Sequence, residues 1–141
     1  MTLSVPLWVL LAFAAWTLVA LLFTVGVYRW HRILTGRDAL SHWRADLVQG
    51  PDWYQRAMRA HANCVENLVV YGAICVVIVA GGIEATILDR LAVVLLAARI
   101  AHTVTHVAFP QTDLVSGIRF VFFFVQLVCM IWMGAFIALQ A

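Results

Sequence analysis

The sequence predicts an all-α fold, an integral membrane bundle of four helices in up-down order that forms a single domain over residues 1–141. Hydrophobic residues make up 65% of the chain and charged residues 11%, whereas soluble domains average about 45–50% and 25%. Long apolar segments also recur four times along the chain, each of them long enough to cross a bilayer. Backbone groups in lipid must pair within the chain, so helices are the expected structure.

The apolar segments place the expected helices at about residues 3–32, 53–82, 87–109 and 114–139. Glycine and proline mark the breaks between them, as they do in turns. The breaking residues are Gly50, Pro51, Gly81, Gly82 and Pro110. We therefore expect a long polar loop after the first helix and short turns after the second and third.

Arginine is distributed unevenly between the two ends of these helices. The first loop and its flanks hold six Arg residues, Arg119 adds a seventh on that side, and the opposite side has Arg90 alone. Basic residues concentrate on the cytoplasmic side of membrane proteins. We therefore expect a multi-pass protein of a bacterial inner membrane or the endoplasmic reticulum, with the first loop cytoplasmic and both termini on the far side.

All nine basic residues are Arg, and the chain contains no Lys. A guanidinium can grip a carboxylate with two donors at once, which an ammonium cannot. The bias favours recognition of an anionic ligand, although an Arg-rich genome would produce the same bias.

The second helix carries a polar face into the membrane. At 100° per residue, one face collects five polar side chains, while His61 points the other way. These five are Arg56, Arg59, Asn63, Glu66 and Asn67. Glu66 lies two to three turns into the membrane, where a carboxylate needs donors that Arg59 and Asn63 could supply. Either this face binds a ligand or it is an ion-pair network that only holds the bundle together.

The third helix carries a second polar stripe, formed by Arg99, His102 and His106. Arg119 and Arg29 fall at the same expected depth. Four Arg residues would then face one buried acid, and an anion with more than one carboxylate would neutralise the excess charge.

The two histidines have the i, i+4 spacing that can hold a metal on a helix. A third ligand would have to come from Glu66 or Cys64. The positive charge of Arg99, one turn away, opposes a cation, so no metal site is expected. The other two cysteines, Cys75 and Cys129, lie in apolar segments and are expected to be packing residues without a disulfide.

Four segments resemble the MAPEG family, the membrane-associated proteins in eicosanoid and glutathione metabolism. Residues 59–67, RAHANCVEN, resemble the family's R-A-H-x-N-x-x-E-N segment, and residues 99–104, RIAHTV, resemble its third-helix R-x-A-H-T-V. Residues 26–29, GVYR, resemble the G-x-x-R that ends the first helix, and Arg119 stands where the family has its thiol-activating Arg. The closest motifs are those of the microsomal glutathione transferase and prostaglandin E synthase branch.

The resemblance implies a homotrimer that binds glutathione as a cosubstrate between neighbouring protomers, near the cytoplasmic face. By position, Arg residues would hold its carboxylates, Glu66 its ammonium group, and Arg119 its sulfur as a thiolate. The cofactor-binding candidates are Arg29, Arg59, Asn63, Glu66, Asn67, His102 and His106. For Arg119, the alternative is an Arg that only anchors the helix end. His106 and Phe123 stand where the branch often has Tyr, and Ala62 stands where it has Arg.

The expected function is a glutathione-dependent membrane transferase or peroxidase that detoxifies lipophilic electrophiles. The expected partners are further copies of the chain, membrane lipids and a lipophilic small molecule, with no nucleic acid. Two alternatives remain: a non-catalytic lipid-binding or scaffold member of the same fold, and a small transporter or haem-bearing anchor.

Overall fold

The computed structural model describes residues 3–44 and 46–140 of the chain. Within those residues all regular structure is helical, and four helical segments are long and apolar enough to cross a membrane. These segments are Val5–Leu34, Asp52–Gly81, Thr86–Ala108 and Asp113–Gln140. The predicted all-α membrane fold is confirmed, and the chain is an integral, multi-pass membrane protein.

The first segment is one continuous rod of three parts. An α-helix, α1 (Val5–Ala20), passes through a π-helical stretch, η1 (Leu21–Gly26), into a second α-helix, α2 (Val27–Leu34). The loop that follows holds a short 3₁₀ turn, η2 (Leu40–His42). The remaining helices are α3 (Asp52–Gly81), α4 (Thr86–Ala108) and α5 (Asp113–Gln140).

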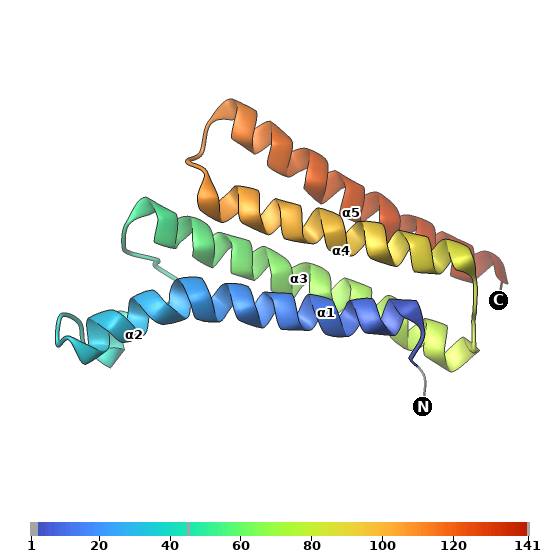
Figure 1. Cartoon of the computed structure of the whole chain (residues 1–141), viewed down its shortest axis with the longest axis horizontal. Helices are drawn as coiled ribbons and strands as arrows, with labels where there is room; N and C mark the ends of the chain where they lie inside the picture. The colour runs from blue at the N-terminus through green and yellow to red at the C-terminus, as the bar shows by residue number, and fades with distance from the viewer. Residues whose placement is uncertain (1–2, 45, 141) are drawn as a thin grey trace.

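Successive segments run in opposite directions, which gives the predicted up-down order (Figure 1). The α2–α3 loop and the α4–α5 turn lie at one end of the bundle, here called the polar end, and both termini lie at the other (Figure 1). α1 packs on α3 and α4, while α5 packs mainly on α4. α5 diverges from α4 towards the polar end (Figure 1), which is where the candidate site lies.

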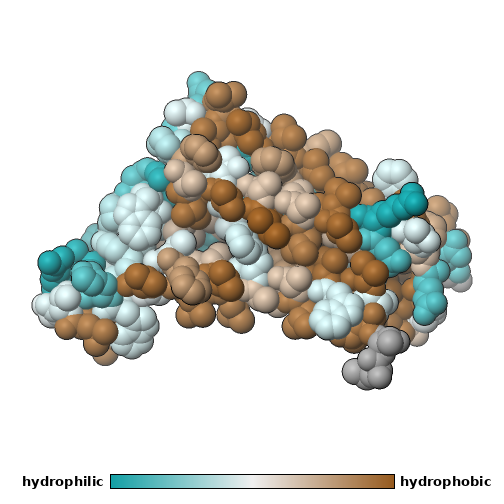
Figure 2. Space-filling model, in the orientation of Figure 1, coloured by the Kyte–Doolittle hydropathy of each residue, from teal (hydrophilic) through white to brown (hydrophobic). Residues whose placement is uncertain are grey.

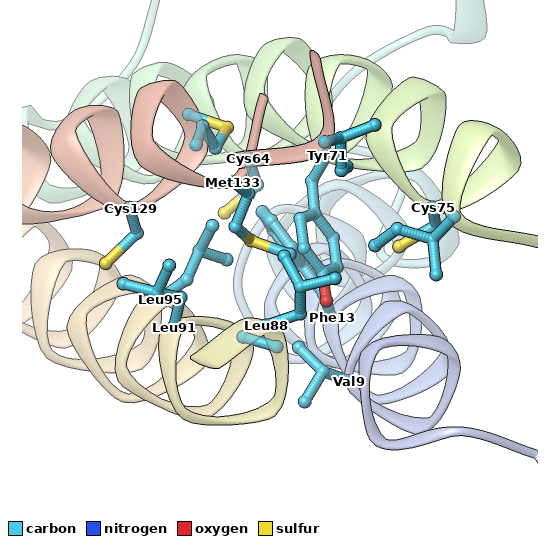
Figure 3. Close-up of a cluster of buried hydrophobic side chains, with 14 residues drawn as sticks. Val9, Phe13, Cys64, Tyr71, Cys75, Leu88, Leu91, Leu95, Cys129 and Met133 are labelled. Atoms are coloured by element: carbon cyan, nitrogen blue, oxygen red, sulfur yellow. The ribbon is translucent and has the colours of Figure 1, made fainter. Parts of the chain in front are cut away.

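The centre of the bundle is an apolar core drawn from α1, α3, α4 and α5 (Figure 3). Phe13 and Tyr71 face each other across it, with ring centroids 6.4 Å apart. All three cysteines are buried and free. Residues of this core are Val9, Phe13, Cys64, Tyr71, Cys75, Ile78, Leu88, Leu91, Ala92, Leu95, Cys129, Met130, Met133 and Ile137.

The outer surface carries apolar side chains around the middle of the bundle and polar ones at its two ends (Figure 2). A soluble protein would not expose such a continuous apolar surface. At 1.5 Å per residue, α3 is about 45 Å long, against about 30 Å for the hydrocarbon core. Part of α3 therefore extends into the headgroup region.

Aromatic residues secure the loop at the polar end. The ring of Tyr28 meets those of Trp43, Trp53 and Tyr54 at centroid distances of 5.8, 5.2 and 4.7 Å. Trp and Tyr are the residues that gather at membrane–water interfaces. In the last turn of α2, Arg32 donates a hydrogen bond to Asp38 of the loop, which lowers the pKa of that carboxyl group.

The other end of α3 is closed by Gly82. Its φ of 57° is left-handed, a conformation that costs glycine nothing. The Ile83 N–H then bonds the Ile78 carbonyl at 3.0 Å, and the Gly82 N–H bonds the Val79 carbonyl at 3.2 Å. These bonds satisfy carbonyls at the helix end and turn the chain into α4.

Tyr71 provides a test of this packing. Its ring is fully buried, and its hydroxyl donates to the Pro6 carbonyl at 2.9 Å, which joins α3 to the start of α1. Tyr71→Phe should lower the free energy of unfolding by about 0.5–1.5 kcal/mol, the usual contribution of one hydrogen bond. Tyr71→Ala should cost about 3–5 kcal/mol, because it also opens a cavity. Thermal unfolding in detergent measures both, and equal losses would contradict this account of the hydroxyl.

Candidate functional site

A cleft of about 400 Å³ opens between α3, α4 and α5 near the polar end. α3 and α4 contribute two pairs of polar residues to it, and α5 contributes the opposite wall. The lining residues are Arg59, Asn63, His102, His106, Ser116, Arg119, Phe120 and Phe123. The structure therefore brings together Arg59, Asn63, His102, His106 and Arg119 of the predicted site. A hollow of about 480 Å³ at the opposite end contains no predicted site residue.

The cleft carries positive charge that no carboxylate balances, since its lining contains no Asp or Glu. Arg59 is exposed. Arg119 is half-buried, and its Nε and Nη1 atoms are buried without a hydrogen-bond partner among residues 3–44 and 46–140. Guanidinium groups of this kind pair best with carboxylates and other oxyanions. The cleft is thus shaped and charged to receive an anion.

Behind this lining lies Arg99, a fully buried residue of α4. Its Nη1 donates to Asn63 Oδ1 at 2.7 Å, and it lies 3.4 Å from His102 Nδ1 and 3.8 Å from Cys64 Sγ. The guanidinium also lies 5.4 Å from the ring centroid of Phe13. No carboxylate within the described residues forms an ion pair with Arg99.

Rings line the part of the cleft between α4 and α5. His102 and His106 meet edge to face, with centroids 5.7 Å apart, and His102 lies 6.3 Å from Phe123. Phe120 is 65% exposed and stacks on Phe124 at 6.1 Å. The cleft therefore has a polar, cationic side and an aromatic side that continues onto the lipid-facing surface of α5.

The expected environment of Glu66 is wrong for the single chain. We expected a buried acid supplied with donors by Arg59 and Asn63, but Glu66 is exposed and Asn63 bonds Arg99 instead. Glu66 makes no ion pair within the part of the chain that the structure describes. Asn67 is half-buried with its Nδ2 atom unpartnered there, and neither residue lines the cleft.

Arg56 also departs from the expected common face of α3. It is buried, forms an ion pair with Asp52 one turn earlier, and donates to the Val107 carbonyl at 3.3 Å. The five polar residues do lie on one side of α3, but the environment changes across that side. Arg56 contacts α4, whereas Arg59 and Glu66 are exposed on the outer surface. Arg56 therefore joins α3 to α4 and leaves the cleft to Arg59.

Arg29 does not enter the cleft of its own chain. Its Nε donates to the Tyr54 hydroxyl at 2.7 Å, and its guanidinium lies 5.4 Å from the Trp43 ring centroid. Tyr54 and Asn63 are nine residues apart on α3, which puts them on opposite sides of the helix. Arg29 and Arg119 therefore do not meet within one protomer, and the role of Arg29 at a site between protomers stays a prediction.

Three cleft residues were missing from the predicted site, Ser116, Phe120 and Phe123. All three lie near Arg119 on α5, at i−3, i+1 and i+4, so their spacing from that Arg was the available signal. Within the described residues, no group of three or more His, Cys, Asp or Glu side chains is placed to hold a metal ion.

Comparison with known proteins gives one family. No curated protein and no solved structure matches the chain, but the model of the MAPEG family matches residues 5–139. The family is associated in general with glutathione and with membrane transferase or peroxidase roles, and its members are commonly oligomeric. Because the match spans all four membrane helices and every residue of the cleft, the chain belongs to the MAPEG family.

Proposed function

We propose that this protein is a glutathione-dependent membrane transferase or peroxidase that acts on lipophilic electrophiles. The observation that carries the proposal is the cationic cleft without a carboxylate. Three other Arg residues near the polar end have Asp partners, in the pairs Arg32–Asp38, Arg44–Asp46 and Arg56–Asp52. Arg59, Arg99 and Arg119 make no ion pair within the described residues, and they lie in or directly behind the cleft.

Glutathione carries the negative charges that this cationic cleft lacks. Its two carboxylates fit Arg59 and the donors of Asn63 and His102, and its thiolate fits Arg119. A cation close to a thiol favours the thiolate, which is the nucleophile. The helix α5 begins at Asp113, so Arg119 is in its second turn. The helix dipole acts mainly within the first turn, and the guanidinium itself therefore provides the stabilisation.

The aromatic side of the cleft supplies the second substrate. An apolar electrophile dissolved in the bilayer can reach the cleft across Phe120 and Phe123. Attack of the thiolate on carbon forms a thioether and expels a leaving group, which is transferase chemistry. Attack on a peroxide oxygen breaks the O–O bond, forms an S–O bond and releases an alcohol; a second glutathione then attacks the sulfenic sulfur, which releases water and leaves glutathione oxidised to its disulfide.

The outer face of α3 supports assembly between copies of the chain. One row of its exposed residues recurs at alternating spacings of four and three, which is the pattern of a packed helical seam. The row consists of Ala62, Glu66, Val69, Ala73, Val76 and Ala80. Small side chains let helices approach closely in a membrane, and an exposed Glu66 at membrane depth needs polar cover. A trimer would provide that cover and would bring the Arg29 of a neighbouring protomer within reach of the cleft.

Native mass spectrometry in detergent should show three copies. Ala73→Trp, which places a large ring on the exposed α3 seam, should shift the population towards monomer, whereas Ala135→Trp on α5 should leave it unchanged. Both alanines are exposed in the single chain. A monomer at every protein concentration would remove the interfacial part of the proposed site.

Glu66→Gln separates ligand binding from a structural role. If the carboxylate holds the glutathione ammonium group, this isosteric change should weaken glutathione binding about 10- to 100-fold, the usual range for a charged hydrogen bond. Calorimetry measures the affinity, and thermal unfolding without glutathione is the control. Lower stability with an unchanged dissociation constant would reject the binding role.

Arg119→Ala should raise the apparent pKa of bound glutathione, read from the near-ultraviolet absorbance of the thiolate, because it removes the cation nearest the sulfur. Turnover should fall on the order of 10²-fold, as for other single stabilising donors, while assembly changes little. Arg119→Lys keeps the charge and should recover part of the rate. A thiol pKa like that of the wild type in Arg119→Ala would move thiolate stabilisation to another residue.

Wild-type protein purified in detergent tests the whole proposal. Wild-type protein should bind glutathione in calorimetry and turn over a lipophilic electrophile. Binding of a lipid-like ligand without turnover would favour the scaffold alternative, and a Soret band would favour a haem anchor.

A further inference from the structure

Arg99 is a buried charge that the proposed mechanism does not use directly. It is fully buried, and its Nε and Nη2 atoms have no hydrogen-bond partner within residues 3–44 and 46–140. A guanidinium in the membrane interior without a carboxylate is costly. The contact with Phe13 is a cation–π interaction, which compensates only part of that cost. Such a costly group is expected where a protein has a functional need for it.

Arg99 has three polar side-chain contacts, and the two shorter ones are to residues that line the cleft, Asn63 and His102. Arg has donors and no acceptor. The atom of Asn63 that faces Arg99 at 2.7 Å must therefore be the amide oxygen, and the ring nitrogen of His102 at 3.4 Å must carry a lone pair. The direction of both contacts follows from the chemistry of Arg, which can only donate.

Each contact fixes what the partner can offer to the cleft. With its oxygen committed to Arg99, Asn63 has its NH₂ group left to donate. With Nδ1 accepting, the neutral His102 ring carries its proton on Nε2 and donates from there. Together with Arg59, Arg119 and the Ser116 hydroxyl, these groups make the polar side of the cleft rich in donors.

Resting on the proposed function, we infer that Arg99 is a positioning residue that sets the amide of Asn63 and the tautomer of His102 as donors to an anionic ligand. Without Arg99, both groups could equally present an acceptor, which a carboxylate or a thiolate would repel. The cost of burying Arg99 is offset by a cleft whose hydrogen-bonding polarity is fixed before the ligand arrives.

The tautomer of His102 is measured by ¹⁵N NMR of histidine-labelled protein in detergent, with its signals assigned by their loss in His102→Gln. The wild type should show protonated Nε2 and unprotonated Nδ1. Arg99→Met should give a mixture of both tautomers, and Arg99→Lys, which also only donates, should keep the wild-type form. A wild-type ring protonated on Nδ1 would overturn the inference, even if every Arg99 variant failed to fold.

Calorimetry with glutathione and thermal unfolding give the second readout. Arg99→Met should weaken glutathione binding about 10- to 100-fold, as for loss of hydrogen bonds to a charged ligand. Its unfolding temperature should stay constant or rise, because an unneutralised buried charge has been removed. A purely structural Arg99 predicts the opposite, a lower unfolding temperature with unchanged affinity. Arg90→Met, on the exposed far end of α4, is the matched control and should change neither.

Asn63→Asp sharpens the test, because it gives Arg99 a carboxylate partner while removing the amide donor from the cleft. The protein should become more stable and bind glutathione more weakly; tighter binding would contradict the role assigned to the amide. If the wild type bound no glutathione at all, the proposed function would fail, whereas the NMR result would still decide whether Arg99 sets the tautomer of His102.

Discussion

A guanidinium held inside the bundle without a carboxylate is the constraint around which the candidate site is arranged. Arg99 can only donate hydrogen bonds, so the groups that touch it must accept, and two of those groups, Asn63 and His102, also line the cleft. In water this preference would be weak, because solvent would satisfy either orientation. In a low-dielectric interior an unmet donor or acceptor costs far more. One buried residue thereby determines the hydrogen-bonding character of a surface that it does not itself expose.

The fold followed from the sequence because lipid leaves few alternatives. Four long, predominantly apolar segments can satisfy their backbones in lipid only as helices, and the short turns after α3 and α4 force the helices that they join into opposite directions. Arg59, Asn63, His102, His106 and Arg119 meet in one cleft because their helices begin or end at the same side of the bundle. Helical periodicity and depth were sufficient to group these residues, since both depend only on position along each helix.

The residues that sequence reasoning misplaced differ in what their side chains touch, which periodicity does not determine. Arg56 has a carboxylate one turn away in Asp52 and a carbonyl on α4 within reach, so it is drawn inward. Arg29 lies against two aromatic rings, those of Trp43 in the loop and Tyr54 at the start of α3. Glu66 points away from the bundle, and only a second protein surface could make its position favourable. A single sequence does not record the contacts between helices, because these depend on how the helices rotate against one another; the Arg56–Asp52 pair, at i, i+4 within α3, is the contact that spacing could have indicated.

These placements divide the arginines by task. Some Arg residues are neutralised by an Asp near in sequence and contribute to the polar end, as in Arg32–Asp38 and Arg44–Asp46. Others have no such partner and remain available to a ligand, as Arg59 and Arg119 do at the cleft. Arg99 belongs to neither group, since its charge is both unneutralised and inaccessible. It nevertheless affects the ligand indirectly. By donating to the Asn63 amide oxygen and to His102 Nδ1, it leaves the amide NH₂ and the His102 Nε2–H to donate into the cleft. The positive field of the cleft and its hydrogen-bonding polarity then act on the same anion, and neither requires the protein to reorganise when the anion binds.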